Sequence, residues 1–127
     1  MKMWSGRFRA PLDPAFEQWQ RSFEFDCRLL ECELESSAAH ARALGQAGLL
    51  SAEELDSVVR GLEQIAEQAA DSAEFVNDDE AEDVHHFVEK KLVELIGTPD
   101  TNSTAGAAAT SRLRLICGYM YAQLAMK

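Results

Sequence analysis

Apolar residues recur every three or four positions through most of the chain, which is the spacing of one face of an α-helix. Asp13 followed by Pro14 predicts an N-cap with proline at the first helical position, opening a short helix that ends near Ser22. No segment shows the strict alternation of apolar and polar residues that predicts a β-strand. The aromatic side chains expected near one face of the short helix are Phe16, Trp19 and Phe23.

Two longer helices should follow. One begins after Asp26 and runs until Gly45 and Gly48 supply a stop. The other begins at Ser51, which forms a capping box with Glu54 three residues later. The apolar stripe of the first contains Leu30, Leu34, Ala38, Ala41 and Leu44, and that of the second contains Leu55, Val58, Val59, Leu62, Ile65, Ala66 and Ala69.

A last helix should be opened by the acidic run DDEAED at residues 78–83, because carboxylates favour the positive end of the helix dipole. Gly97 should end it. We expect the three longer helices to meet in one core, so that the sequence predicts an all-α fold. The buried residues should include Leu30, Leu34, Val59, Leu62, Ile65, Val84, Val88 and Leu92.

Composition narrows the class of protein. A chain of 127 residues suffices for one domain, and 46% hydrophobic with 8% aromatic content suits a helical protein rich in alanine and leucine. The net charge of −10 argues against a nucleic-acid partner. Cys27, Cys32 and Cys117 lack metal-site spacing, which favours free thiols in a reducing cytosol. Without an apolar leader or a membrane-length run, we expect a cytoplasmic protein with no membrane contact.

The composition changes abruptly after Gly97. Residues 98–127 contain a single acidic residue, Asp100, out of the 22 in the chain. We therefore divide the chain into a helical domain of residues 1–97 and a tail of residues 98–127, which is either one helix or disordered. The apolar positions that would line such a helix are Leu113, Ile116, Met120 and Leu124.

Four segments, in order along the chain, resemble the N-terminal domain of the argininosuccinate lyases, a family of the fumarase and aspartase superfamily. They cover about three quarters of the chain. Four matches in the same order are far more specific than one short motif. The resemblance implies a small helical N-terminal domain without the long central helical bundle of that superfamily. The segments are WSGRF at residues 4–8, RSFEFD at residues 21–26 with Arg28 and Leu29, AHARAL at residues 39–44 leading to residues 48–50, and EDVHHFVEKKLVELIG at residues 82–97.

The family pattern would continue with a basic signature, KLH[ST]GRSRN[DE]Q, and a helix beginning ATDLRL. The signature is missing here, although RLRL at residues 112–115 echoes its end. If one nucleotide was lost near the Gly97 codon, residues 101–113 can be read back as KLHSGRSRNEQI, and the same frame continues to Tyr121 as ATDLRLYV. The tail is therefore interpreted as the frameshifted end of a lyase, a hypothesis that the nucleotide sequence decides.

The resemblance gives roles to two residues. His85 occupies the histidine of the family's E-D-[IV]-H pattern beside the active site, where it would organise the site and would not be the base. Ser22 falls on a serine implicated in holding the carboxylate end of the substrate. Arg7, a cation in an acidic chain, would attract a polycarboxylate. From the residues alone, Ser22 can instead be a helix cap and Arg7 a solvated surface cation.

A second interpretation of His85 and His86 does not depend on the family. His86 lies four residues after Glu82 and His85 lies four residues before Glu89, so that each pair would share a helix face and form an ion pair. A metal site needs three or four converging ligands, and no further histidine or cysteine lies nearby. The sequence therefore predicts no bound metal.

The chemistry implied by the resemblance is the elimination of fumarate from argininosuccinate, which leaves arginine and needs no cofactor. In the family, each active site is built from three subunits of a homotetramer. The basic signature, a later histidine segment and the serine loop that carries the base are absent here. We therefore expect a lyase fragment that is inactive alone.

Two other hypotheses compete with this one. In the first, the chain is a non-catalytic helical interaction module, which docks on intact lyase subunits. A relationship to adenylosuccinate lyase or fumarase is disfavoured, because the WSGRF and EDVHHFVE segments are specific to argininosuccinate lyases.

Overall fold

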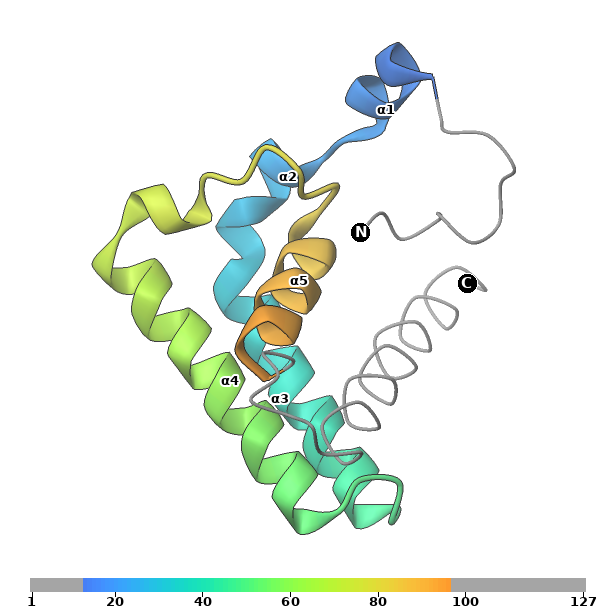
Figure 1. Ribbon diagram of the computed structural model, residues 1–127, viewed down its shortest axis with the longest axis vertical. Coiled ribbons are helices and arrows are strands. Elements are labelled where there is room, and N and C mark those ends of the chain that lie inside the picture. Colours follow the sequence, from blue (N-terminus) through green and yellow to red (C-terminus); the bar gives the residue numbers. More distant parts are fainter. Residues whose placement is uncertain (1–12, 97–127) are drawn as a thin grey trace.

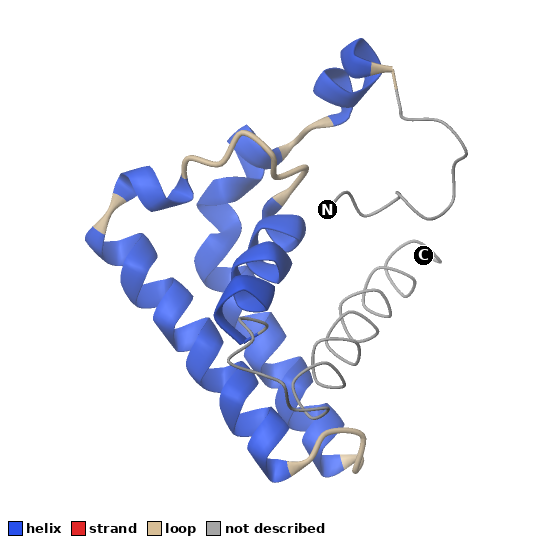
Figure 2. Cartoon of the chain, in the orientation of Figure 1, coloured by secondary structure: helices blue, strands red, loops and turns tan. Residues whose placement is uncertain are grey.

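The computed structural model describes residues 13–96, and every regular element in this range is helical (Figures 1 and 2). The all-α prediction is therefore confirmed. None of the described helices is both long enough and apolar enough to cross a membrane. The elements in chain order are α1 (Pro14–Gln20), α2 (Phe23–Asp26), the 3-10 helix η1 (Cys27–Leu29), α3 (Leu30–Gln46), α4 (Ala52–Asp71), the 3-10 helix η2 (Ala73–Val76) and α5 (Val84–Ile96).

The first helix begins as predicted but does not bury its aromatic face. The Asp13 carboxylate accepts hydrogen bonds from the backbone N–H groups of Ala15 at 2.9 Å and Phe16 at 3.2 Å. Arg21 is extended, which turns the chain between α1 and α2. Phe23 is consequently buried while Phe16 and Trp19 are 48% and 79% exposed, so the predicted common face is wrong. In Figure 1, α1 stands apart from the packed helices.

The second helical run starts earlier than predicted. It opens at Phe23 as α2, tightens into η1 and continues as α3. Phe23 supplies the reason, because its ring stacks on that of Phe87 in α5, with centroids 5.1 Å apart. Past the end of α3, Gly48 takes a positive φ of 73°, a conformation that costs glycine little and that makes the turn toward α4.

The capping box at the start of α4 is confirmed. The Glu54 N–H donates to Ser51 Oγ at 3.1 Å, and the Ser51 N–H donates to Glu54 Oε2 at 2.8 Å. The capping box thereby satisfies two backbone N–H groups at this helix terminus. The helix then continues to Asp71.

The start predicted for the last helix is wrong. The acidic run folds as a loop, because Asp78 Oδ1 accepts the N–H groups of Glu80 at 2.8 Å and Ala81 at 3.0 Å. Such local side-chain bonds offer the backbone an alternative to a helix. The helix begins at Val84, six residues after the start of this run, where Asp83 Oδ1 accepts the N–H of His86 at 2.8 Å.

The core lies where α3, α4 and α5 pack against one another (Figure 1). Seven of the eight predicted core residues are buried, and the exception is Val59, which is half-buried while Val58 points inward. Phe87 and Ile65 are fully enclosed. At Gly61 a Cβ would lie 2.5 Å from Leu92 Cδ1, so the glycine permits the close approach of α4 and α5.

Candidate functional site

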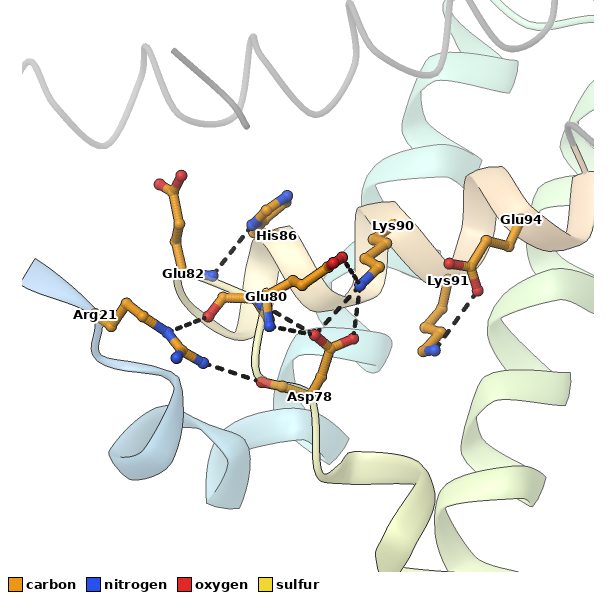
Figure 3. Close-up of polar contacts among 9 residues, drawn as sticks. Arg21, Asp78, Glu80, Glu82, His86, Lys90, Lys91 and Glu94 are labelled. Atoms are coloured by element: carbon orange, nitrogen blue, oxygen red, sulfur yellow. Dashed lines mark hydrogen bonds and ion pairs between the residues drawn. The ribbon is translucent and has the colours of Figure 1, made fainter. Parts of the chain in front are cut away.

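Backbone hydrogen bonds attach the Ser22 segment to the loop that precedes α5. The N–H groups of Ser22 and Phe23 both donate to the carbonyl oxygen of Glu82, at 2.9 and 3.1 Å. Arg21 strengthens this attachment, because its Nε donates to Ala81 O and its Nη2 to Asp78 O, each at 3.0 Å (Figure 3). The structure therefore places Ser22 against the EDVH segment that contains His85.

The Ser22 side chain does not cap a helix. It stands at the N-cap position of α2, yet it makes no capping hydrogen bond there. Its hydroxyl donates instead to Asp26 Oδ2, one turn further along the chain. The cap interpretation is therefore wrong, and Ser22 belongs to a polar pair beside the last helix.

His85 is joined to α3 by an ion pair. Its Nδ1 lies 2.7 Å from Glu33 Oε1, and the side chain of Glu33 is only 10% exposed. The Ser37 hydroxyl donates to the same oxygen at 3.1 Å. Two helices distant in sequence are thus connected through one buried carboxylate.

The surroundings of His85 favour its charged form. The hydrogen bond to Glu33 raises the pKa of His85, while partial burial acts in the opposite direction. The negative charges of Glu33, Asp83 and Asp26 raise it further. The imidazolium consequently persists to higher pH than that of an ordinary histidine. A histidine held in this form is a hydrogen-bond donor on both nitrogens, which suits an organising role better than that of a base.

His86 has a different environment and is only 5% exposed. Its Nδ1 accepts the backbone N–H of Glu82 at 3.1 Å, so the neutral ring carries its proton on Nε2. The sequence predicted an ion pair between His86 and Glu82 on one helix face. The two residues do meet, but Glu82 precedes α5 and this contact is made by its backbone N–H. His86 therefore fixes the loop that receives Ser22.

An open cleft of about 540 Å³ lies between α1 and this loop. Its basic side chains are engaged, since Lys90 Nζ lies 3.0 Å from Asp78 Oδ2 and 2.9 Å from Glu80 Oε2 (Figure 3). The bond to Glu80 is the main reason that the pKa of Lys90 is raised, and the pKa of Glu80 is lowered in return. The cleft is lined by Pro14, Glu17, Gln18, Arg21, Asp79, Glu80, Glu82, His86 and Lys90.

Glu33 and Asp26 also belong to this site and were not predicted from the sequence. A signal for Glu33 exists: it falls next to Leu34 and three residues after Leu30, on the face of α3 that is buried. A carboxylate on an apolar face needs a partner. Arg7 lies outside the described residues, as do Cys117 and the predicted tail helix. Within residues 13–96, no three His, Cys, Asp or Glu side chains are placed to hold a metal ion.

Comparison with known proteins agrees with the resemblance seen in the sequence. The family model described as lyase matches residues 6–113, which extends past Gly97. The argininosuccinate lyase of Koribacter versatilis is 56% identical over 97 residues, covering 76% of this chain and 20% of the relative. That of Acidobacterium capsulatum is 48% identical over 102 residues, covering 76% and 21%.

A third relative extends the comparison. The argininosuccinate lyase of Thermosynechococcus vestitus is 45% identical over 94 residues, covering 74% of this chain and 20% of the relative. The chain thus spans about a fifth of the length of the curated relatives that it matches. Since the lyase model matches most of its residues, the chain belongs to the lyase family and corresponds to the N-terminal part of an argininosuccinate lyase.

Proposed function

We propose that this chain supplies one corner of an argininosuccinate lyase active site, where argininosuccinate is cleaved into arginine and fumarate. The observation that carries the proposal is the attachment of Ser22 to the EDVH segment through Glu82 O. It brings together two segments that lie far apart in sequence. The similarity to argininosuccinate lyases supports the substrate and the reaction class.

Within this corner His85 organises the site, and Ser22 holds a carboxylate of the substrate. Because the Ser22 hydroxyl has one proton and donates it to Asp26 in the structure, it must turn away from Asp26 to donate to the substrate. His85 is oriented by Glu33. Arg7 adds positive charge for the same polycarboxylate. The reaction proceeds without a cofactor, in the cytoplasm, as a step of arginine biosynthesis.

The chain alone is inactive in this proposal. It matches only about a fifth of a relative, and the remaining segments supply the base and the central helices of a homotetramer. Residues 1–97 form the lyase domain, and residues 98–127 are a frameshifted tail. Sequencing the gene and the DNA that follows tests the second statement, because an intact lyase frame should continue downstream after one inserted nucleotide.

Purified 127-residue protein should therefore release no detectable fumarate from argininosuccinate, because the segment that carries the base in the family is not among those that this chain resembles. Ultraviolet absorbance of fumarate provides the measurement. Steady turnover by this protein alone would contradict the proposal.

A chimera tests the roles of the residues. Residues 1–97 of this chain should replace the corresponding segment of the Koribacter versatilis lyase and retain turnover. His85→Gln in the chimera should then lower kcat, whereas the control Arg60→Gln, whose exposed side chain pairs with Asp56, should not. An inactive but tetrameric chimera would argue against the lyase assignment of this domain.

A second candidate function is a helical interaction module that docks on intact lyase subunits. Exposed apolar side chains in α1, α2 and η1 favour it: Phe16, Trp19, Phe25 and Leu29. The isolated chain should then bind a complete lyase in analytical ultracentrifugation, and Trp19→Ser should weaken that binding. The gene would end cleanly, with no lyase frame downstream.

A further inference from the structure

A buried carboxylate on α3 determines how His85 is held. Glu33 is 9% exposed and lies among apolar core positions. Removing a carboxylate from water is costly unless it is paired and hydrogen-bonded. Glu33 meets both needs through one oxygen, with His85 Nδ1 at 2.7 Å and Ser37 Oγ at 3.1 Å.

The direction of this hydrogen bond determines which nitrogen of the His85 ring carries a proton. An ionised carboxylate only accepts hydrogen bonds, so Nδ1 of His85 must carry a proton. When the ring is neutral, its lone pair is then on Nε2, and when it is charged, Nε2 is a donor. Asp26 from α2 and Asp83 from the preceding loop add negative charge around the ring. Carboxylates from three segments, α3, α2 and the loop before α5, therefore all raise the pKa of His85.

We propose that Glu33 is the positioning residue of His85, fixing its Nδ1 on α3 and keeping the ring a proton donor toward a carboxylate of the substrate. This proposal rests on the proposed lyase function. It gives the charged pair between α3 and α5 a task that an apolar contact joining the same helices could not perform. It also gives His85 an electrostatic task distinct from proton removal.

Long-range ¹H–¹⁵N NMR spectra of the 127-residue chain test the proposal, since they report the tautomer and the protonation of each histidine. A His85→Gln variant assigns the signals. In the wild type, neutral His85 should carry its proton on Nδ1, and its pKa should lie above the ordinary value. An Nε2–H tautomer in the wild type would overturn the proposal without any further variant.

Glu33→Gln keeps the size of the side chain and removes its charge, so the pKa of His85 should fall. Glu33→Asp keeps the charge, so the pKa of His85 should fall less than it does in Glu33→Gln. The matched control is Glu31→Gln on an exposed position of the same helix, which should leave the titration of His85 unchanged. Equal titration in all variants would overturn the proposal. These measurements need no turnover, so their outcome is separate from that of the fumarate assay and the chimera.

Discussion

At the scale of residues, the buried polar side chains of Glu33 and His86 each have a specific partner, whereas Nε2 of the half-buried His40 has none among the described residues. Glu33 is paired with His85, and His86 accepts a backbone N–H from Glu82. Arg21 donates to two loop carbonyls. Each of these bonds joins two segments or fixes a turn. The polar residues therefore determine the shape of the candidate site, whereas the apolar residues stabilise the fold of the described domain.

The ion pair of His85 should make stability depend on pH. The pKa of His85 is raised in the folded state, mainly by its hydrogen bond to Glu33. Its contribution is therefore complete below the unfolded pKa, about 6.5, and is lost as pH rises through the higher folded pKa. Urea unfolding measured from about pH 5 to about pH 8, the range in which histidines titrate, should show this loss of stability. Glu33→Gln should flatten it, and an unchanged slope would refute the role of the pair.

At the scale of elements, α3, α4 and α5 are each held by one apolar face. In α4 this face contains Val58, Leu62 and Ile65, all buried, and the opposite face is solvated. Gly61 lies on the same side and allows Leu92 of α5 to approach. Packing, and not helix propensity, therefore provides most of the stability of this arrangement.

Two neighbouring positions in α4 test this facing. Leu62→Ala should lower the free energy of unfolding by about 2–5 kcal/mol, because it removes apolar contacts and leaves a cavity. Glu63→Ala should change it by less than about 0.5 kcal/mol, since its side chain is exposed. Chemical denaturation measures both. Equal losses at the two positions would mean that α4 faces the core differently.

At the scale of the whole molecule, residues 13–96 already contain a continuous core. The expectation that residues 98–127 come from a shifted frame concerns residues outside this range. Side chains from a foreign frame would not have been selected to fit the core.

Deletion of residues 98–127 should therefore leave the domain no less stable and make it more soluble. Thermal unfolding and the concentration at which the protein precipitates provide the two readouts. Deletion of the 20 residues of α4 serves as the destabilising control. Loss of folding after removal of the tail would show that it belongs to the structure and would count strongly against the frameshift hypothesis.

Local signals in the sequence determined the helices and most of the core. The Asp13 cap, the Ser51 capping box and the apolar stripes depend on residues within one or two turns, which is why they could be predicted. The early start of α2 could not be, because it depends on the stacking of Phe23 on Phe87.

The candidate site shows the same division. Motif resemblance singled out Ser22 and His85, but it gave no information on the side chains around them. Only the tertiary structure revealed Glu33 beneath His85 and the carbonyl of Glu82 that receives Ser22. These contacts join residues far apart in the chain, and no local periodicity encodes them. The sequence thus determined which faces are buried, whereas the packing of α3 against α5 decided which polar groups meet there.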